Sequence, residues 1–258
     1  MSSMTRLLSL LSAGSMMVSG AMYKAAPQND INGTLFLANR QWMVSEAYEP
    51  DDLQMSDVPG QVRRMRKDAA EALREMFAAC KEETGIQLLS ISGYRSYAKQ
   101  DSIYRRKLRS VKKNEAKAQE YVAPPGASEH QLGVAMDIGQ KHKVNLEVSF
   151  AKTKGAKWCR KNCWRFGFIL RYAEEWEKIT GYKYEPWHFR YVGKEYAKEI
   201  HDANVPLETW LIDHRVKVLK ELIGERDDSA WVVISPPEDT IPTVPPATMT
   251  DLDAAGGK

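Results

Sequence analysis

The chain has 258 residues, of which 43% are hydrophobic and 28% are charged. This length fits one sizeable domain with extensions at its ends, and the balance is that of a globular protein that can bury a core. The formal net charge of +3 is too small to argue for a nucleic-acid-binding protein.

The first 26 residues have the layout of an export signal. Arg6 precedes a mostly apolar run from Leu7 to Met22, which has small residues near its end. A positive charge, a short apolar stretch and small residues in that order are typical of a secretory signal, and the run is too short and too polar for a spanning helix. We expect residues 1–26 to be an export signal or an N-terminal anchor, with a disordered cytosolic leader as the alternative.

Helices and short strands are expected in mixed order after this leader. Residues 61–83 carry apolar side chains at three- and four-residue spacings, as an amphipathic helix does, and Gly85 follows as a stop signal. Further helices are expected at 97–110, 157–166, 194–204 and 206–224, and strands at 86–91, 134–138, 168–172 and 189–192. Because no strand–helix–strand rhythm repeats, we predict an α+β fold. It would be a single domain over residues 34–224, with a small, mainly antiparallel sheet and flanking helices.

The C-terminal residues 236–258 are rich in proline and contain few large apolar side chains. Such a composition cannot bury enough apolar surface to fold, so this tail is expected to be disordered.

Three cysteines, an odd number, stand at Cys80, Cys159 and Cys163. A zinc site built from cysteines would need four ligands in tighter pairs. We expect these residues to act as small buried hydrophobes, with one disulfide that includes Cys80 as the alternative if the protein is exported.

Three separated segments hold the residues that can carry chemistry: S-G-Y-R-S at 92–96, P-G-A-S-E-H-Q-L-G-V-A-M-D-I at 125–138 and E-P-W-H-F-R-Y at 185–191. A hydrolytic zinc site needs three protein ligands, an open position for water and a carboxylate that takes the proton of that water. The spacing of His130 and Asp137 suits a loop and the strand after it, and Glu185 lies one turn before His188. Spacing alone is compatible with a His/Asp/His metal site, and a structural histidine among aromatic residues is the alternative for His188.

Taken together, the three segments resemble the VanY-type D-alanyl-D-alanine carboxypeptidases, which are zinc peptidases of bacterial peptidoglycan. The likeness covers roughly residues 34–205. It implies a hedgehog/DD-peptidase-like fold with a zinc site between the motif loops, and it implies that Zn²⁺ is bound by His130, Asp137 and His188.

The same resemblance implies the roles of the neighbouring residues. Glu185 would be the catalytic base, and Arg95 would meet the substrate near the scissile carbonyl. Ser128 and Gln131 would contact the substrate carboxylate or support the ligands. Glu129, Tyr94 and Trp187 would shape the pocket.

The expected function is therefore hydrolysis of the terminal D-alanine of peptidoglycan stem peptides by an exported monomer on the cell-wall side of the membrane. Two alternative enzymes would share this fold: an L,D-carboxypeptidase and a cross-link endopeptidase. A non-catalytic zinc-stabilised binding module is the alternative that is not an enzyme. Glu185 and Arg95 argue for an enzyme because a structural zinc site needs neither. No nucleic acid is expected as a partner, and membrane contact is expected only through an N-terminal anchor.

Overall fold

The computed structural model describes residues 27–223. The chain divides into two units, Met1–Leu222 and Ile223–Lys258, and all the elements described below belong to the first unit, except for the last residue of the final helix. The export signal predicted at 1–26 and the tail predicted at 236–258 lie outside the described residues and stay predictions. Between residues 27 and 223, no helix is long and apolar enough to cross a membrane.

Helices and strands alternate irregularly along the described chain. The α-helices are α2 (Lys67–Thr84), α3 (Tyr97–Ser110), α4 (Glu115–Gln119), α5 (Lys154–Asn162), α6 (Glu177–Thr180), α7 (Lys194–Ala203) and α8 (Leu207–Ile223). Short 3-10 helices are η1 (Pro27–Asn29), η2 (Val148–Lys152), η3 (Cys163–Phe166) and η4 (Glu174–Trp176). The strands are β1 (Leu53–Met55), β2 (Arg64–Arg66), β3 (Leu88–Ser92), β4 (Ala135–Gln140), β5 (Phe168–Leu170) and β6 (His188–Tyr191).

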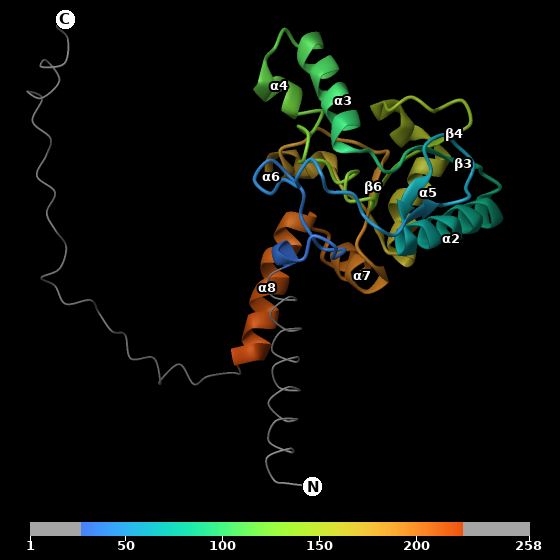
Figure 1. Cartoon of the computed structure of the whole chain (residues 1–258). Coiled ribbons are helices and arrows are strands. Elements are labelled where there is room, and N and C mark those ends of the chain that lie inside the picture. The colour runs from blue at the N-terminus through green and yellow to red at the C-terminus, as the bar shows by residue number, and fades with distance from the viewer. Residues whose placement is uncertain (1–26, 224–258) are drawn as a thin grey trace, which may run out of the picture. The chain divides into compact units, whose positions relative to one another are not determined.

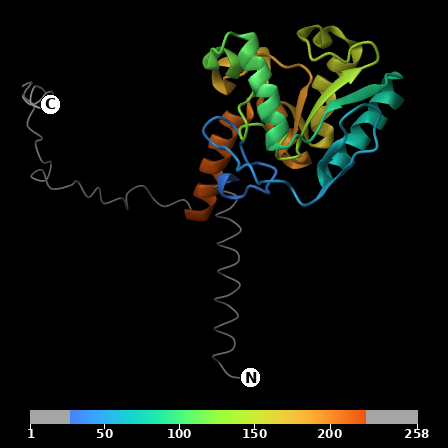
Figure 2. The ribbon, with the colours of Figure 1, turned by 45° about the horizontal axis from the view of Figure 1, so that its top comes forward.

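The central sheet has four antiparallel strands in the order β3-β4-β6-β5, and β1 and β2 form a separate antiparallel pair. Strands β4 and β6 therefore lie in the middle of the sheet, although about 50 residues separate them in sequence. In both views of the ribbon, α3 and α4 lie together, apart from α2 (Figures 1 and 2). The expected α+β domain with a small antiparallel sheet is confirmed.

One face of the sheet packs against α2 and α5 to form the main core. Helix α2 buries Leu73, Met76 and Phe77 in the same cluster as Met136 and Ile138 of β4. Because side chains alternate between the faces of a strand, Met136 and Ile138 enter this core while the residue between them points to the other face. That residue is an aspartate.

A second apolar cluster connects α7 and α8 to the beginning of the described chain. Leu35, Ile169 of β5, Ile200 of α7 and Trp210 of α8 are among its members. The first turn of α8 is therefore held against the domain next to β5.

Two predicted helices begin three or more residues away from their expected start. The helix predicted over 61–83 begins at Lys67, because residues 64–66 pair with β1 instead and Arg66 N donates to the carbonyl of Gly133 at 2.8 Å. The helix predicted over 157–166 begins three residues earlier, because the hydroxyl of Thr153 caps it, and it tightens into η3 before Gly167. Helix α3 coincides with its predicted range.

The three cysteines are buried and none is in a disulfide. Their expected behaviour as small hydrophobic residues is confirmed: all three belong to the main core cluster.

Candidate active site

The register of β4 against β6 creates the centre of the site. Asp137 of β4 and His188 of β6 are directly paired across the two strands. Both side chains point away from the core, to the face that carries no helix of the main core. His130 reaches the same point from the turn 128–133, which is closed by a bond from Gly133 N to the carbonyl of His130.

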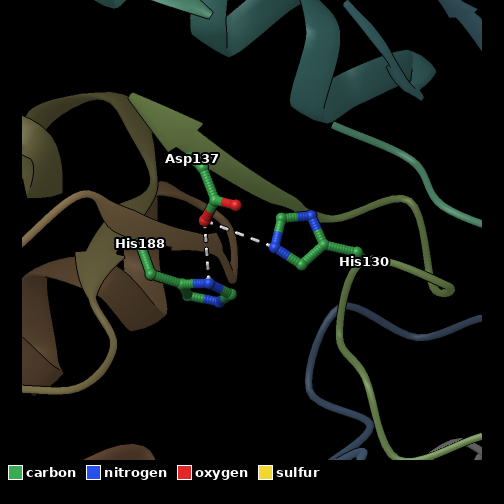
Figure 3. A group of neighbouring side chains, drawn as sticks. All are labelled: His130, Asp137 and His188. Carbon is green, nitrogen blue, oxygen red and sulfur yellow. Dashed lines mark hydrogen bonds and ion pairs between the residues drawn. The ribbon is translucent and has the colours of Figure 1, made fainter. Parts of the chain in front are cut away.

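These three side chains surround one point in space. Asp137 Oδ1 lies 3.3 Å from His130 Nε2 and 3.1 Å from His188 Nδ1. The three ligand atoms lie within 4.8 Å of one another, and all three residues are buried. Figure 3 shows both imidazole rings turned toward the same carboxylate. Two imidazoles and one carboxylate are a donor set of catalytic zinc sites, which leave a further position open.

The backbone carbonyl of Gly93 fixes the orientation of the His130 ring. This oxygen lies 2.8 Å from His130 Nδ1, so Nδ1 carries the proton and Nε2 keeps its lone pair for the site. Within residues 27–223, His130 Nε2 is buried and has no hydrogen-bond partner. A buried nitrogen left in this state fits a metal ligand, since buried polar atoms otherwise find partners.

Glu129 fixes the second ring from behind. Its Oε2 lies 3.3 Å from His188 Nε2, so this nitrogen donates to the carboxylate and His188 Nδ1 faces Asp137. A carboxylate behind a ligand histidine is a common support in zinc sites, because it fixes the tautomer and raises the basicity of the ring.

The protonation states of His130 and Asp137 suit metal binding. Burial and the nearby Arg95 lower the pKa of His130 to about 4, so this imidazole is neutral at neutral pH. Burial opposes ionisation of Asp137, but His130 and His188 outweigh it and hold the pKa of this carboxyl well below its usual range. A neutral imidazole and an ionised carboxylate are the forms that bind metal ions. Burial lowers the pKa of His188, but the hydrogen bonds with Asp137 and Glu129 outweigh it and raise this pKa to about 9, so a bound cation would have to displace a proton from the ring.

Glu185 stands beside the cluster with its side chain 16% exposed. Its backbone N–H donates to the carbonyl of Tyr172 at 3.0 Å, and its Oε2 lies 3.7 Å from His188 Nδ1. Burial raises the pKa of Glu185 to about 7, with a further rise from Asp137 that His188 and Arg95 oppose. A carboxyl with a pKa in this range can accept a proton and return it near neutral pH.

Arg95 brings a positive charge to the same cavity. Its backbone N–H donates to the carbonyl of His130 at 3.1 Å, which ties the first motif to the second. Burial lowers the pKa of the guanidinium, and the negative charges of Asp137 and Glu185 oppose this. Within the described part of the chain, its Nε is buried without a hydrogen-bond partner, so it has a donor to offer a ligand.

The site opens into a cavity of about 670 Å³. Six of the seven residues predicted for the site line it: Arg95, Ser128, His130, Asp137, Glu185 and His188. Aromatic side chains from the third motif and its surroundings complete the walls, among them Tyr172, Tyr182, Tyr184 and Trp187.

Gln131, the seventh predicted residue, does not line this cavity. Its side chain is fully buried, and its Nε2 donates to the carbonyls of Ser45 at 2.9 Å and Tyr48 at 3.2 Å. In the turn, His130 points into the cavity and the next side chain points to the segment at 45–48. These two bonds hold in place the turn that carries His130, which is compatible with the expected role in supporting the ligands.

Sequence reasoning missed the charges beneath the site. Arg171 and Arg190, which are 1% and 0% exposed, both approach Glu129. A signal was available in the sequence, because Arg171 directly follows the apolar strand β5, Arg190 lies within β6, and a buried charge needs a partner. The partner itself could not be read from the sequence.

The chain matches known proteins across this whole region. A sequence model of the VanY family, described as D-alanyl-D-alanine carboxypeptidase, matches residues 62–194, more than half of the chain. YodJ of Bacillus subtilis (strain 168) is 45% identical over 183 residues, which cover 68% of this chain and 66% of that protein. The chain therefore spans just under two thirds of that relative.

Two solved structures share the fold. The LdcB LD-carboxypeptidase is 44% identical with a TM-score of 0.66, and the match covers 70% of this chain and 86% of that one. A vancomycin-resistance D,D-pentapeptidase VanY, solved as a mutant in complex with Zn(II), is 34% identical with a TM-score of 0.59, covering 69% and 98%. The hedgehog/DD-peptidase-like fold is confirmed. This chain belongs to the VanY family of D-alanyl-D-alanine carboxypeptidases.

Proposed function

We propose that this chain is a zinc-dependent carboxypeptidase that removes the terminal D-alanine of peptidoglycan stem peptides. The observation that carries the proposal is the presence of Glu185 and Arg95 in one cavity with the three candidate ligands His130, Asp137 and His188. A zinc site that served only stability would need neither an adjacent base nor a buried guanidinium.

The roles of the chain's own residues follow from their positions. When bound, zinc supplies Lewis-acid polarisation and lowers the pKa of a water molecule to about 7. Glu185 takes the proton of the attacking water and later gives it to the leaving amine. Arg95 stabilises the negative charge that develops on the scissile carbonyl oxygen, since its guanidinium is charged at every working pH. The hydroxyl of Ser128 donates a hydrogen bond to the terminal carboxylate of the substrate.

A second candidate is hydrolysis by an L,D-carboxypeptidase, which cuts a tetrapeptide rather than a pentapeptide. The likeness to LdcB favours it, because the identity of 44% exceeds the 34% shared with the D,D-pentapeptidase. The family match favours D,D cleavage. Both candidates use the same zinc site and differ in the residue before the cut.

The test is to incubate the purified protein with penta- and tetrapeptide stems, with and without a chelator. The masses of the products are then measured by mass spectrometry. Loss of one alanine from the pentapeptide, abolished by the chelator, is the expected result. Loss from the tetrapeptide alone would favour the second candidate. No metal-dependent product from either peptide, with zinc bound, would favour a non-catalytic binding module.

The proposal also covers the bounds of the catalytic domain, its oligomeric state and its location. We place the catalytic domain at residues 34–224 of a monomer, exported to the cell-wall side of the membrane by its leader. The substrates of the family support this location, because peptidoglycan lies outside the cytoplasmic membrane.

A further inference from the structure

Three buried charged side chains, Glu129, Arg171 and Arg190, and the partly buried Glu208 form an ion network beneath His188. Arg171 Nε donates to Glu129 Oε1 at 2.8 Å, and Arg190 Nη1 lies 3.1 Å from the same oxygen. The second oxygen of Glu129 faces His188 Nε2 at 3.3 Å. The carboxylate of Glu129 thus contacts two arginines and the candidate metal ligand His188.

Arg171 is shared between two carboxylates. Its Nη1 and Nη2 donate to the two oxygens of Glu208 at 2.9 Å and 2.6 Å, a bidentate pair of the strong kind. Arg190 has other acceptors, since its Nη2 donates to the carbonyls of Thr34 and Phe36. Of the two arginines, Arg171 is therefore the one whose position against Glu129 depends on the charge of Glu208.

Glu208 lies outside the residues that the family model matches. It stands in the first turn of α8, beyond residue 194, where the family match ends. It is not among the residues that line the catalytic cavity; it lines a second cavity of about 680 Å³. Arg171 is the residue that links Glu208 to Glu129 by direct contacts.

We propose that Glu208 is a positioning residue for His188, acting through Arg171 and Glu129. The proposal rests on the zinc site of the proposed function. With Glu208 in place, the two carboxylates balance the two guanidinium charges, and Arg171 gives Glu129 one N–H. The other oxygen of Glu129 is then free to accept from His188 Nε2. This bond holds the ring with Nδ1 toward the metal and makes it a better ligand.

Removal of the charge on Glu208 would change how Glu129 shares its two oxygens between Arg171 and His188. The buried guanidinium of Arg171 would keep a single carboxylate partner and would turn both of its free nitrogens toward Glu129. Glu129 would then be drawn from His188, and the network would carry one uncompensated positive charge near a divalent cation. Both changes weaken metal binding without touching a ligand.

The experiment measures zinc affinity in Glu208→Gln by competition with a chromogenic chelator, well below the melting temperature. Loss of a support behind a metal ligand costs about 10–100-fold in affinity, and Glu208 is two contacts further from the ligand than Glu129 is, so we expect a loss of about 3–10-fold. The visible spectrum of the cobalt-substituted protein should shift as well, because it reports the ligand field. The matched control is Glu221→Gln, an exposed glutamate of the same helix, which should bind zinc as the wild type does.

Glu208→Asp separates positioning from folding. This variant keeps the charge but shortens its reach, so its affinity should lie between those of the wild type and Glu208→Gln, with a smaller spectral shift. If Glu208→Gln does not fold, Glu208→Asp alone must still differ from the wild type in affinity and cobalt spectrum. A lower melting temperature with unchanged affinity and spectrum would overturn the proposal and leave Glu208 as an anchor of α8. A wild type that binds no zinc would overturn the proposed function together with it.

Discussion

The carbonyl of Gly93 orients His130, and Gly93→Ala tests whether this bond matters. A Cβ at residue 93 would lie 2.4 Å from the carbonyl oxygen of Arg64 and 3.0 Å from Met136 Cε. Real Cβ contacts are not closer than 3.0 Å, so residue 93 and the Arg64 carbonyl must separate by at least 0.6 Å, the difference between 3.0 Å and 2.4 Å. Were this whole movement to carry the Gly93 carbonyl away from His130 Nδ1, the 2.8 Å bond would lengthen to at most 3.4 Å, where hydrogen bonds are weak.

Two magnitudes follow from this displacement. Overpacking of a buried site costs about 1–3 kcal/mol of unfolding free energy, and each kcal/mol lowers the melting temperature of a domain of this size by roughly 2–4 °C. Loss of a group that orients a ligand histidine weakens metal binding by about 10–100-fold. We expect both effects in Gly93→Ala, measured by thermal unfolding in excess chelator and by zinc titration of the folded protein.

The control is Gly85→Ala at the end of α2. Gly85 has a φ of 71°, and a Cβ there would meet no atom within 4 Å, so alanine would strain the backbone without a collision. Left-handed backbone costs a residue with a side chain roughly 1–2 kcal/mol, comparable to the cost at Gly93. Zinc affinity should be unchanged in this control. If Gly93→Ala loses stability but binds zinc like Gly85→Ala, the Gly93 carbonyl does not position His130, and the reasoning is wrong.

Three further predictions concern the ligands, the base and the substrate. His188→Ala should contain little zinc by elemental analysis and should melt at a lower temperature in zinc buffer, because metal binding stabilises the folded state; full occupancy would remove His188 from the site. Glu185→Gln should keep its zinc but lose turnover by about 10²–10⁴-fold, and near-normal product formation would refute its role as the base. Amidation of the substrate C-terminus should lower kcat/KM at least about tenfold, or about 1.4 kcal/mol, while equal rates would point to a cross-link endopeptidase.

The sequence predicted which side chains gather in the cavity because these residues cluster in three short segments. Within a segment, spacing is enough: Glu185 precedes His188 by one turn, and the 3.1 Å bond between their backbones closes it. The range of α3 was also predictable, since Ser96 caps its beginning through a bond to Lys99 N, which depends only on neighbouring residues.

Contacts between distant segments could not be predicted in this way. The bidentate pair of Arg171 and Glu208 joins residues 37 positions apart, and no periodicity marks it. Gln131 shows the same limit at short range, because the direction of a side chain in a turn depends on the backbone angles of the turn. Its bond to the carbonyl of Ser45 also depends on how the segment around Ser45 packs against the turn, which the sequence of the turn does not predict.

The register between β4 and β6 links the chemistry to the core. Asp137 faces His188 because Met136 faces Phe189, and Met136 and Phe189 belong to the main apolar cluster. A slip of one residue would turn every side chain of β6 to the opposite face, burying His188 among apolar groups and exposing Phe189 in the cavity. Such a slip would cost both the metal ligand and the packing of a large aromatic side chain. Selection for a stable core therefore also keeps Asp137 and His188 opposite each other.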